Sequence, residues 1–132
     1  MEKINLKTMI PDKLIEVLQH EGVVAIATLD SQGAIHIANT WNSYLHITDD
    51  GHLTGPVGGM RATEDNLRYS NKVVITLGSR EVQGFYSKGT GFLIHAKMEM
   101  ESEGEAYKAL KQHFPWARAL FRIIPDSIVQ TL

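Results

Sequence analysis

The segment that decides the fold class is VVAIATL (23–29), followed by DSQG (30–33) and AIHIANT (34–40). Two runs of apolar and β-branched residues flank a short segment of turn-forming residues, which is the pattern of two antiparallel strands joined by a tight connection. The sequence therefore predicts a β-hairpin early in the chain.

Strand patterns continue downstream, and helical patterns are few. WNSYLHIT (41–48) and HLTGPV (52–57) flank a DDG turn and predict a second strand pair. Further extended segments are expected at 72–78, 79–86, 91–101 and 117–125, and helices at 11 to about 20, 63 to about 69 and 104–114. Many short strands without βαβ alternation predict a mainly β protein, an antiparallel barrel with peripheral helices.

Composition limits the classes of function. The 132 residues predict a single domain, 1–132, with 1–8 as an N-terminal extension. Thirteen basic and fifteen acidic side chains give a net charge of -2, so nucleic acid is not an expected partner. No apolar run approaches the roughly 20 residues of a membrane helix, and no secretory signal is visible, so no membrane contact and a cytoplasmic location are expected.

Common catalytic and metal-binding patterns are missing from the sequence. There is no cysteine, and the six histidines have no tight metal-ligand spacing. No GxSxG motif surrounds a serine, and the glycines near 55–59 lack the lysine that ends a P-loop. We therefore assign no catalytic residue and no metal ligand.

The first candidate site is NTWNSYL (39–45), which combines amides, hydroxyls and two aromatic rings. On a continuous strand its alternate residues would lie on opposite faces, so both faces would carry polar groups that need partners. A bound polar ligand would provide those partners. The alternative, which the local sequence leaves open, is a strand whose rings lie in a core or dimer interface and whose amides are hydrated.

The second candidate is PVGGMRATE (56–64), where two glycines precede a helix that Thr63 is expected to open. A helix N-terminus offers free N–H donors and positive potential, and Arg61 could add a charge-assisted contact to an anion. The alternative is an ordinary glycine turn with a threonine cap, and Glu64 and Asp65 would repel an anion unless they point away. Trp116 is a third candidate, as a ring against a planar ligand or as a core residue.

Taken in order, several motifs resemble one known family, the small FMN-binding proteins first described from sulfate-reducing bacteria, in the pyridoxamine 5'-phosphate oxidase-like split-barrel superfamily. The resemblance extends from about Met9 to Leu132 and rests on EGVVAIAT (21–28), NTWNSYL (39–45), PVGGM and TE (56–64), TLGSR (76–80), GTGFLI (89–94), WARA (116–119) and QTL (130–132).

The resemblance implies a six-stranded antiparallel split barrel that forms a homodimer, with FMN held non-covalently near the subunit interface. It implies a cofactor site made of Glu21, Asn39, Thr40, Trp41, Asn42, Ser43, Tyr44, Leu45, Gly58, Gly59, Met60, Arg61, Ala62, Thr63, Trp116 and Leu132. Within that set, Thr63 would bind the phosphate, Glu21 would be an acidic group near the flavin, and Leu132 would reach the flavin of the partner subunit.

One position departs from the family pattern, because Ala62 replaces a lysine that precedes the phosphate-binding threonine. Arg61 is the nearest group that could compensate. The implied function is a redox flavoprotein that exchanges electrons with a protein or small-molecule partner. The alternatives are a flavin-dependent oxidoreductase, such as a flavin reductase or a pyridoxamine-phosphate-oxidase-like enzyme, and a split barrel without flavin that binds haem or another protein.

Overall fold

The structure is a computed structural model that describes residues 9–132. In chain order its elements are α1 (Asp12–Leu18), β1 (Val23–Leu29), β2 (Ile35–Trp41), the 3-10 helix η2 (Asn42–Tyr44), β3 (His46–Ile47), β4 (Leu53–Val57), α2 (Arg61–Tyr69), β5 (Lys72–Gln83), β6 (Lys88–Glu101), α3 (Glu105–His113) and β7 (Ala119–Gln130).

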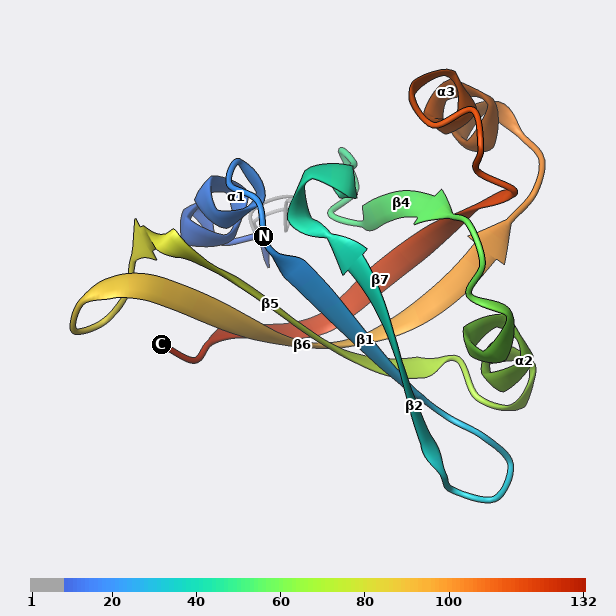
Figure 1. The fold of residues 1–132 in the computed structure, drawn as a ribbon, viewed down its shortest axis with the longest axis horizontal. Coiled ribbons are helices and arrows are strands. Elements are labelled where there is room, and N and C mark those ends of the chain that lie inside the picture. The colour runs from blue at the N-terminus through green and yellow to red at the C-terminus, as the bar shows by residue number, and fades with distance from the viewer. Residues whose placement is uncertain (1–8) are drawn as a thin grey trace, which may run out of the picture.

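The strands form one antiparallel sheet with the order β2-β1-β5-β6-β7-β4-β3 (Figure 1). The edges of the sheet are β2, which pairs only with β1, and β3, which pairs only with the first two residues of β4, so the sheet is not closed between β2 and the rest of β4. The expected mainly β, antiparallel split-barrel class is confirmed. The sheet has seven strands where six were expected, because the two residues of β3 pair with β4 as a short additional strand.

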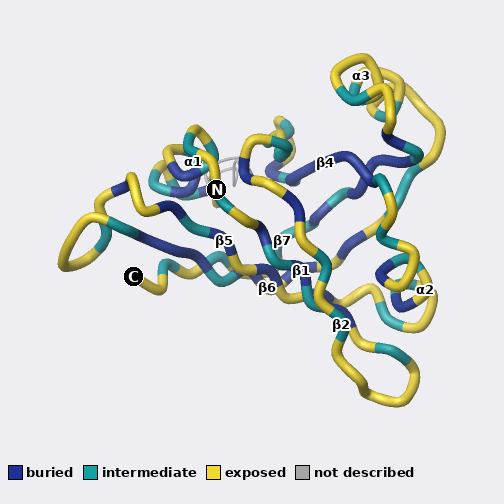
Figure 2. Tube along the Cα trace, in the orientation of Figure 1, coloured by how far each residue is buried: buried dark blue, intermediate teal, exposed yellow. Residues whose placement is uncertain are grey.

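The core lies on the inner face of the sheet, where strand alternation directs apolar side chains (Figure 2). Ile26, Ile75 and Ile94 are fully buried and come from three neighbouring strands. Leu14 and Val17 of α1 are also fully buried and join the same cluster. This packing fixes the inner side of β1 and β5, and with them the position of β2.

The strand expected through residue 45 ends at Trp41, so the alternating faces expected for 39–45 are wrong beyond that residue. Asn42 is the cause. Its backbone N–H donates to Gly22 O at 2.9 Å, and its side-chain amide donates to His20 O and Gly78 O, each at 3.0 Å. These bonds turn the chain into η2.

Two other boundaries differ from expectation. α2 begins at Arg61, two residues before the Thr63 start that the sequence suggested, and its N-cap is Met60. β7 continues to Gln130 through Pro125, which has no N–H to give to the ladder. Pro125 lies opposite Ala96, and the register of the β6–β7 pairing shifts next to it, between His95 and Ala96, where Asp126 is passed over.

Among residues 9–132, no helix is long and apolar enough to cross a membrane. The expected N-terminal extension, 1–8, lies outside the described residues, and the cytoplasmic location stays a prediction.

Candidate functional site

A cavity of about 460 Å³ opens at the split between β2 and β4. Its size falls within the usual range of small-molecule sites, roughly 300–1,000 Å³. Three segments line it: β2 with η2, the turn from β4 into α2, and the segment before β7. The lining residues are His36, Ala38, Asn39, Thr40, Trp41, Tyr44, Pro56, Gly58, Gly59, Met60, Arg61, Ala62 and Trp116. We call this space the split cavity.

The turn into α2 has an unusual backbone. Met60 has φ 56° and ψ 34°, and within residues 9–132 no other non-glycine residue has a positive φ. A Cβ added at Gly58 would come within 3.2 Å of the Trp116 ring, whereas one added at Gly59 would meet nothing within 4 Å. The turn therefore packs against Trp116 at one glycine and leaves open space beside the next.

The N-terminus of α2 lies at this turn and offers hydrogen-bond donors to the split cavity. Glu64 N donates to Met60 O at 2.9 Å, so the amides of residues 61–63 come before the first bond of the helix. Met60 makes no side-chain capping bond to them. Free amides at the positive end of a helix form an arrangement that suits an anion.

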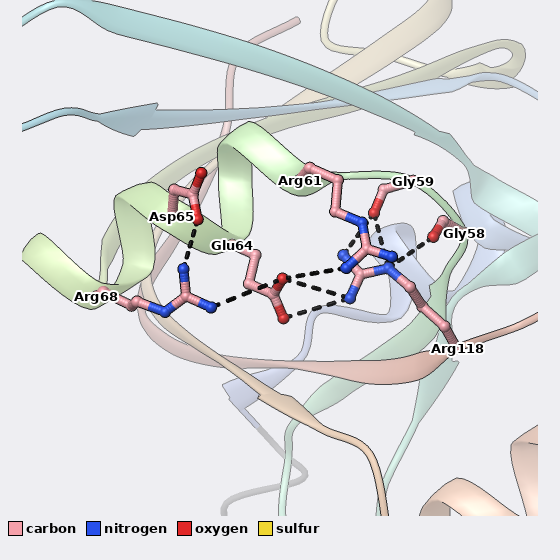
Figure 3. A network of polar contacts seen from close by, with 7 residues as sticks. All are labelled: Gly58, Gly59, Arg61, Glu64, Asp65, Arg68 and Arg118. Carbon is pink, nitrogen blue, oxygen red and sulfur yellow. Dashed lines mark hydrogen bonds and ion pairs between the residues drawn. The ribbon is translucent and has the colours of Figure 1, made fainter.

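Arg118, which precedes β7, holds the glycine turn in place (Figure 3). Its Nε donates to Gly58 O at 2.8 Å, and its Nη2 donates to Gly59 O at 2.6 Å. The backbone N–H of Arg118 also donates to Val57 O at 2.9 Å. The guanidinium thus engages two carbonyl oxygens that would otherwise be free to face and repel a bound anion.

The two carboxylates of α2 that were expected to repel an anion are paired with arginines, which compensate their negative charge. Glu64 lies 3.3 Å from Arg118 Nη1, 3.8 Å from Arg61 Nη1 and 4.0 Å from Arg68 Nη2. Asp65 is paired with Arg68 (Figure 3). Three guanidinium groups against two carboxylates leave a net charge of +1 at this end of the split cavity.

The other wall of the split cavity is aromatic. The Tyr44 ring centroid lies 5.9 Å from that of Trp116 and 5.0 Å from that of Phe114, and the Phe114 and Trp116 centroids are 5.7 Å apart. Trp41 is 44% exposed and Trp116 is 53% exposed, so both present ring surface to the outside. This wall suits a planar, partly apolar ligand.

The structure brings together ten of the sixteen residues expected to bind the cofactor, all of them along the split cavity. Glu21 and Leu132 instead line a second cavity of about 610 Å³, formed with the turn between β5 and β6. The expected residues outside both cavities are Asn42, Ser43, Leu45 and Thr63.

These four residues contact other parts of the protein and do not line either cavity. Asn42 is fully buried and ties η2 to α1 and β5, and Leu45 packs against the core. Thr63 is also fully buried, and its hydroxyl has no hydrogen-bond partner within the described part of the chain. Ser43 Oγ donates to Glu21 Oε2 at 2.7 Å.

The bond from Ser43 controls the ionisation of Glu21. Together with the backbone N–H groups of Ser43 and Gly22, it holds the pKa of the Glu21 carboxyl below its ordinary value. The same three bonds fix the direction of the carboxylate.

Sequence reasoning missed four residues of the site: His36, Ala38, Pro56 and Arg118. His36 and Ala38 alternate with Thr40 on β2, so strand periodicity carried this signal. Arg118 stood inside the WARA motif, but nothing local linked it to the glycines. Within residues 9–132, no group of three His, Asp or Glu side chains could hold a metal ion.

Comparisons with known proteins agree with this architecture. A family model described as pyridoxamine 5'-phosphate oxidase matches residues 10–130. A protein of Nitratidesulfovibrio vulgaris (strain Miyazaki F) named FMN-binding protein is 46% identical over 124 residues, which are 94% of this chain and 100% of that relative.

Solved structures share the fold at low identity. A HupZ variant from Group A Streptococcus has a TM-score of 0.76 at 19% identity, over 92% of this chain and 99% of that one. An FMN-binding protein from Syntrophomonas wolfei has a TM-score of 0.73 at 15% identity, over 96% and 88%. The resemblance noted in the sequence is thus confirmed, and the chain belongs to the pyridoxamine 5'-phosphate oxidase family.

Proposed function

We propose that this protein binds FMN non-covalently in the split cavity and exchanges electrons with a redox partner. The observation that carries the proposal is that the two ends of this cavity differ in chemistry. One end has anion-binding groups, and the other has aromatic rings. The 46% identical relative is named FMN-binding protein, which supports the same ligand.

The phosphate would bind at the N-terminus of α2. The amides of residues 61–63 and the exposed guanidinium of Arg61 are the donors available there, and the buried hydroxyl of Thr63, which has no partner within the described residues, lies behind them in the first turn of the helix. A buried hydroxyl without a partner costs about 1–3 kcal/mol, so a phosphate oxygen that paired with Thr63 would remove that cost. These groups are present although Ala62 supplies no charge.

The isoalloxazine would lie along Trp41, Tyr44 and Trp116. When bound, FMN supplies the redox chemistry, and the chain binds it, orients it and sets its electrostatic surroundings. Apart from Arg61 and His36, the lining carries no basic side chain, so a second phosphate-bearing ligand such as pyridoxamine phosphate would lack a charged clamp. This favours electron exchange over an oxidase reaction.

The outer face of the sheet supports the homodimer. Strand register places seven exposed large apolar residues on it, namely Val23, Leu29, Ile35, Ile37, Trp41, Val74 and Val129. Large exposed apolar patches on a soluble protein mark interaction surfaces, and each partner in a standard protein interface buries about 800 Å² of such a surface. A second copy of this chain is the occupant we propose.

The test is to purify the protein, record its visible spectrum, and titrate the apoprotein with FMN. We expect a yellow protein with about one FMN per chain. Gly59→Trp should abolish binding without unfolding the chain, because open space beside Gly59 receives the ring. Ala34→Trp, on an exposed turn, is the matched control and should bind FMN normally. A wild-type apoprotein that binds no FMN would refute the proposal.

A further inference from the structure

A further cavity, of about 420 Å³, lies between α3 and the strands β3 and β4. Its volume is within the usual range of small-molecule sites, roughly 300–1,000 Å³. We call it the α3 cavity. Tyr44 lines both this cavity and the split cavity, and the two have no other lining residue in common. The proposed flavin site therefore leaves the α3 cavity unused, although the two cavities share one wall.

The side of α3 that faces this cavity is mostly apolar but is not packed. Ala106, Ala109, Leu110 and His113 line the cavity, and their spacing of three and four residues places them on one face of the helix. No residue of α3 is buried, and Figure 2 shows the helix as largely exposed. An amphipathic helix normally buries its apolar face against the core. This face of α3 instead borders space that a ligand could fill.

Two polar side chains on another side of α3 hold the helix in this position. Tyr107 Oη donates to Ala117 O at 2.8 Å, and Lys111 Nζ donates to the same oxygen at 3.4 Å. Tyr107 and Lys111 are about one turn apart, and neither lines the α3 cavity. On the cavity side the helix carries two alanines, which leave room that larger side chains would occupy. The space therefore follows from the sequence of α3 and from its attachment at Ala117.

One buried polar group of the α3 cavity lacks a partner. Thr54 lines the cavity and is only 4% exposed, and none of the hydrogen bonds among residues 9–132 involves its hydroxyl. In the pairing of β3 with β4, His46 lies directly opposite Thr54, so the two side chains share one face of the sheet. A buried hydroxyl without a partner is costly. It therefore points to a ligand that carries a hydrogen-bonding oxygen.

The lining of the α3 cavity has no acidic side chain and no Lys or Arg, whereas Arg61 lines the split cavity. A phosphate or carboxylate bound here would lose its water without gaining an ion pair, which is costly. Phe114 and Leu110 offer apolar surface, and the centroid of the Phe114 ring lies 5.0 Å from that of Tyr44. These features suit a neutral aromatic ligand.

We infer that the α3 cavity is a second small-molecule site, which binds a neutral aromatic molecule with a hydroxyl or carbonyl oxygen on its ring. The ring would contact Leu110 and Phe114, and the oxygen would pair with the Thr54 hydroxyl. The inference extends to the flavin through Tyr44, and this part rests on the proposed function. A ligand in the α3 cavity would restrict the Tyr44 ring that FMN also needs, so each ligand would strengthen the binding of the other.

The test is calorimetric titration of the apoprotein with 2-naphthol, a neutral probe of this class. We expect about one 2-naphthol per chain, bound about two- to tenfold more tightly than naphthalene, which lacks the oxygen. Thr54→Val should remove this preference without lowering Tm, because valine leaves no unpaired hydroxyl in the cavity wall. A wild type that binds neither probe, or binds both equally, would overturn the inference, as would an unchanged preference in Thr54→Val.

Three tryptophan variants locate the bound probe. Ala109→Trp fills the α3 cavity from an exposed helix position and should abolish 2-naphthol binding. Lys108→Trp is the matched control, since Lys108 is exposed on the same helix and does not line the cavity. Gly59→Trp, which blocks the split cavity, should also bind 2-naphthol normally.

Two results with these variants would overturn the inference. Loss of 2-naphthol binding in Gly59→Trp would place the probe in the split cavity. A dimer that dissociates in Ala109→Trp, measured by sedimentation velocity, would show that a second copy of the chain occupies the α3 cavity.

FMN titrations with and without saturating 2-naphthol test the coupling through Tyr44. We expect FMN to bind at least about twofold more tightly when the α3 cavity is occupied, and Ala109→Trp should remove this effect of 2-naphthol. Equal FMN affinity in the two titrations of the wild type would refute the coupling. A wild type that binds 2-naphthol but not FMN would refute the proposed function alone and would support the second site.

Discussion

Replacement of Arg118 by methionine tests how the glycine turn is held. The variant keeps a long side chain but removes the donors to Gly58 O and Gly59 O and the ion pair with Glu64. A hydrogen bond from a charged donor contributes about 1.5–3 kcal/mol. Gly59 O is exposed and can be hydrated, so only the bond to the part-buried Gly58 O is counted at that value, and the ion pair adds about 0–1 kcal/mol.

The expected loss in the free energy of unfolding is therefore about 1.5–4 kcal/mol. For a chain of 132 residues this corresponds to a fall in Tm of roughly 5–14 °C. FMN affinity should fall about tenfold or more, equivalent to about 1.4 kcal/mol, because the turn and the amides of α2 lose their fixed direction. Riboflavin affinity should change much less, since riboflavin has no phosphate.

Thermal unfolding of the apoprotein and calorimetric titration with both ligands measure these effects. Arg68→Met is the matched control, because Arg68 pairs with Glu64 and Asp65 on the surface and makes no bond to the glycine carbonyls. Its effect on stability should stay near 0–1 kcal/mol. If the two variants lower FMN affinity equally, Arg118 acts only through its positive charge and not through its bonds to the glycine carbonyls. The reasoning about the turn would then be refuted.

Four smaller changes probe the charges around the site. Arg61→Ala should lower FMN affinity more than riboflavin affinity in calorimetry, and equal losses would count against a phosphate contact. Ala62→Lys should raise FMN affinity with a gain that shrinks as salt is added, and a salt-independent gain would exclude a charge effect. Ser43→Ala should return the pKa of Glu21 toward its ordinary 4.5 in an NMR titration. The lowered pKa stabilises the fold above about that pH and the effect is lost as the pH falls, so the stability gap between wild type and Ser43→Ala should close in acid. Glu21→Gln should raise the reduction potential of bound FMN, and an unchanged potential would place the carboxylate away from any flavin.

The sequence predicted the elements whose signals are local. Alternation and turn residues marked the hairpin of β1 and β2, and two glycines before an acidic turn marked the start of α2 within two residues. The ordered motifs identified the family. These signals depend only on residues that are neighbours in the sequence, so they can be recognised without knowing the tertiary structure.

What could not be predicted depends on partners far away in the chain. Asn42 looked like a ligand-binding amide, but its side chain bonds to carbonyl oxygens 22 and 36 residues away and bends the strand. Arg118 looked like one member of a motif, but it holds carbonyls 60 and 59 residues away. No periodicity encodes such bonds, because they exist only after the sheet has folded.

The open sheet links the two kinds of binding that we propose. If β2 paired with β4, the barrel would close and side chains would fill its interior, as in small closed barrels. Because β2 is instead an edge strand, its inner side borders the split cavity, while its outer side exposes Ile35, Ile37 and Trp41. An unpaired edge with apolar flanks is prone to aggregation unless something covers it. A flavin on the inner side and a second copy on the outer side would cover the same strand, and Trp41 takes part in both contacts. FMN binding and dimerisation should therefore strengthen each other, since each fixes the strand that the other needs.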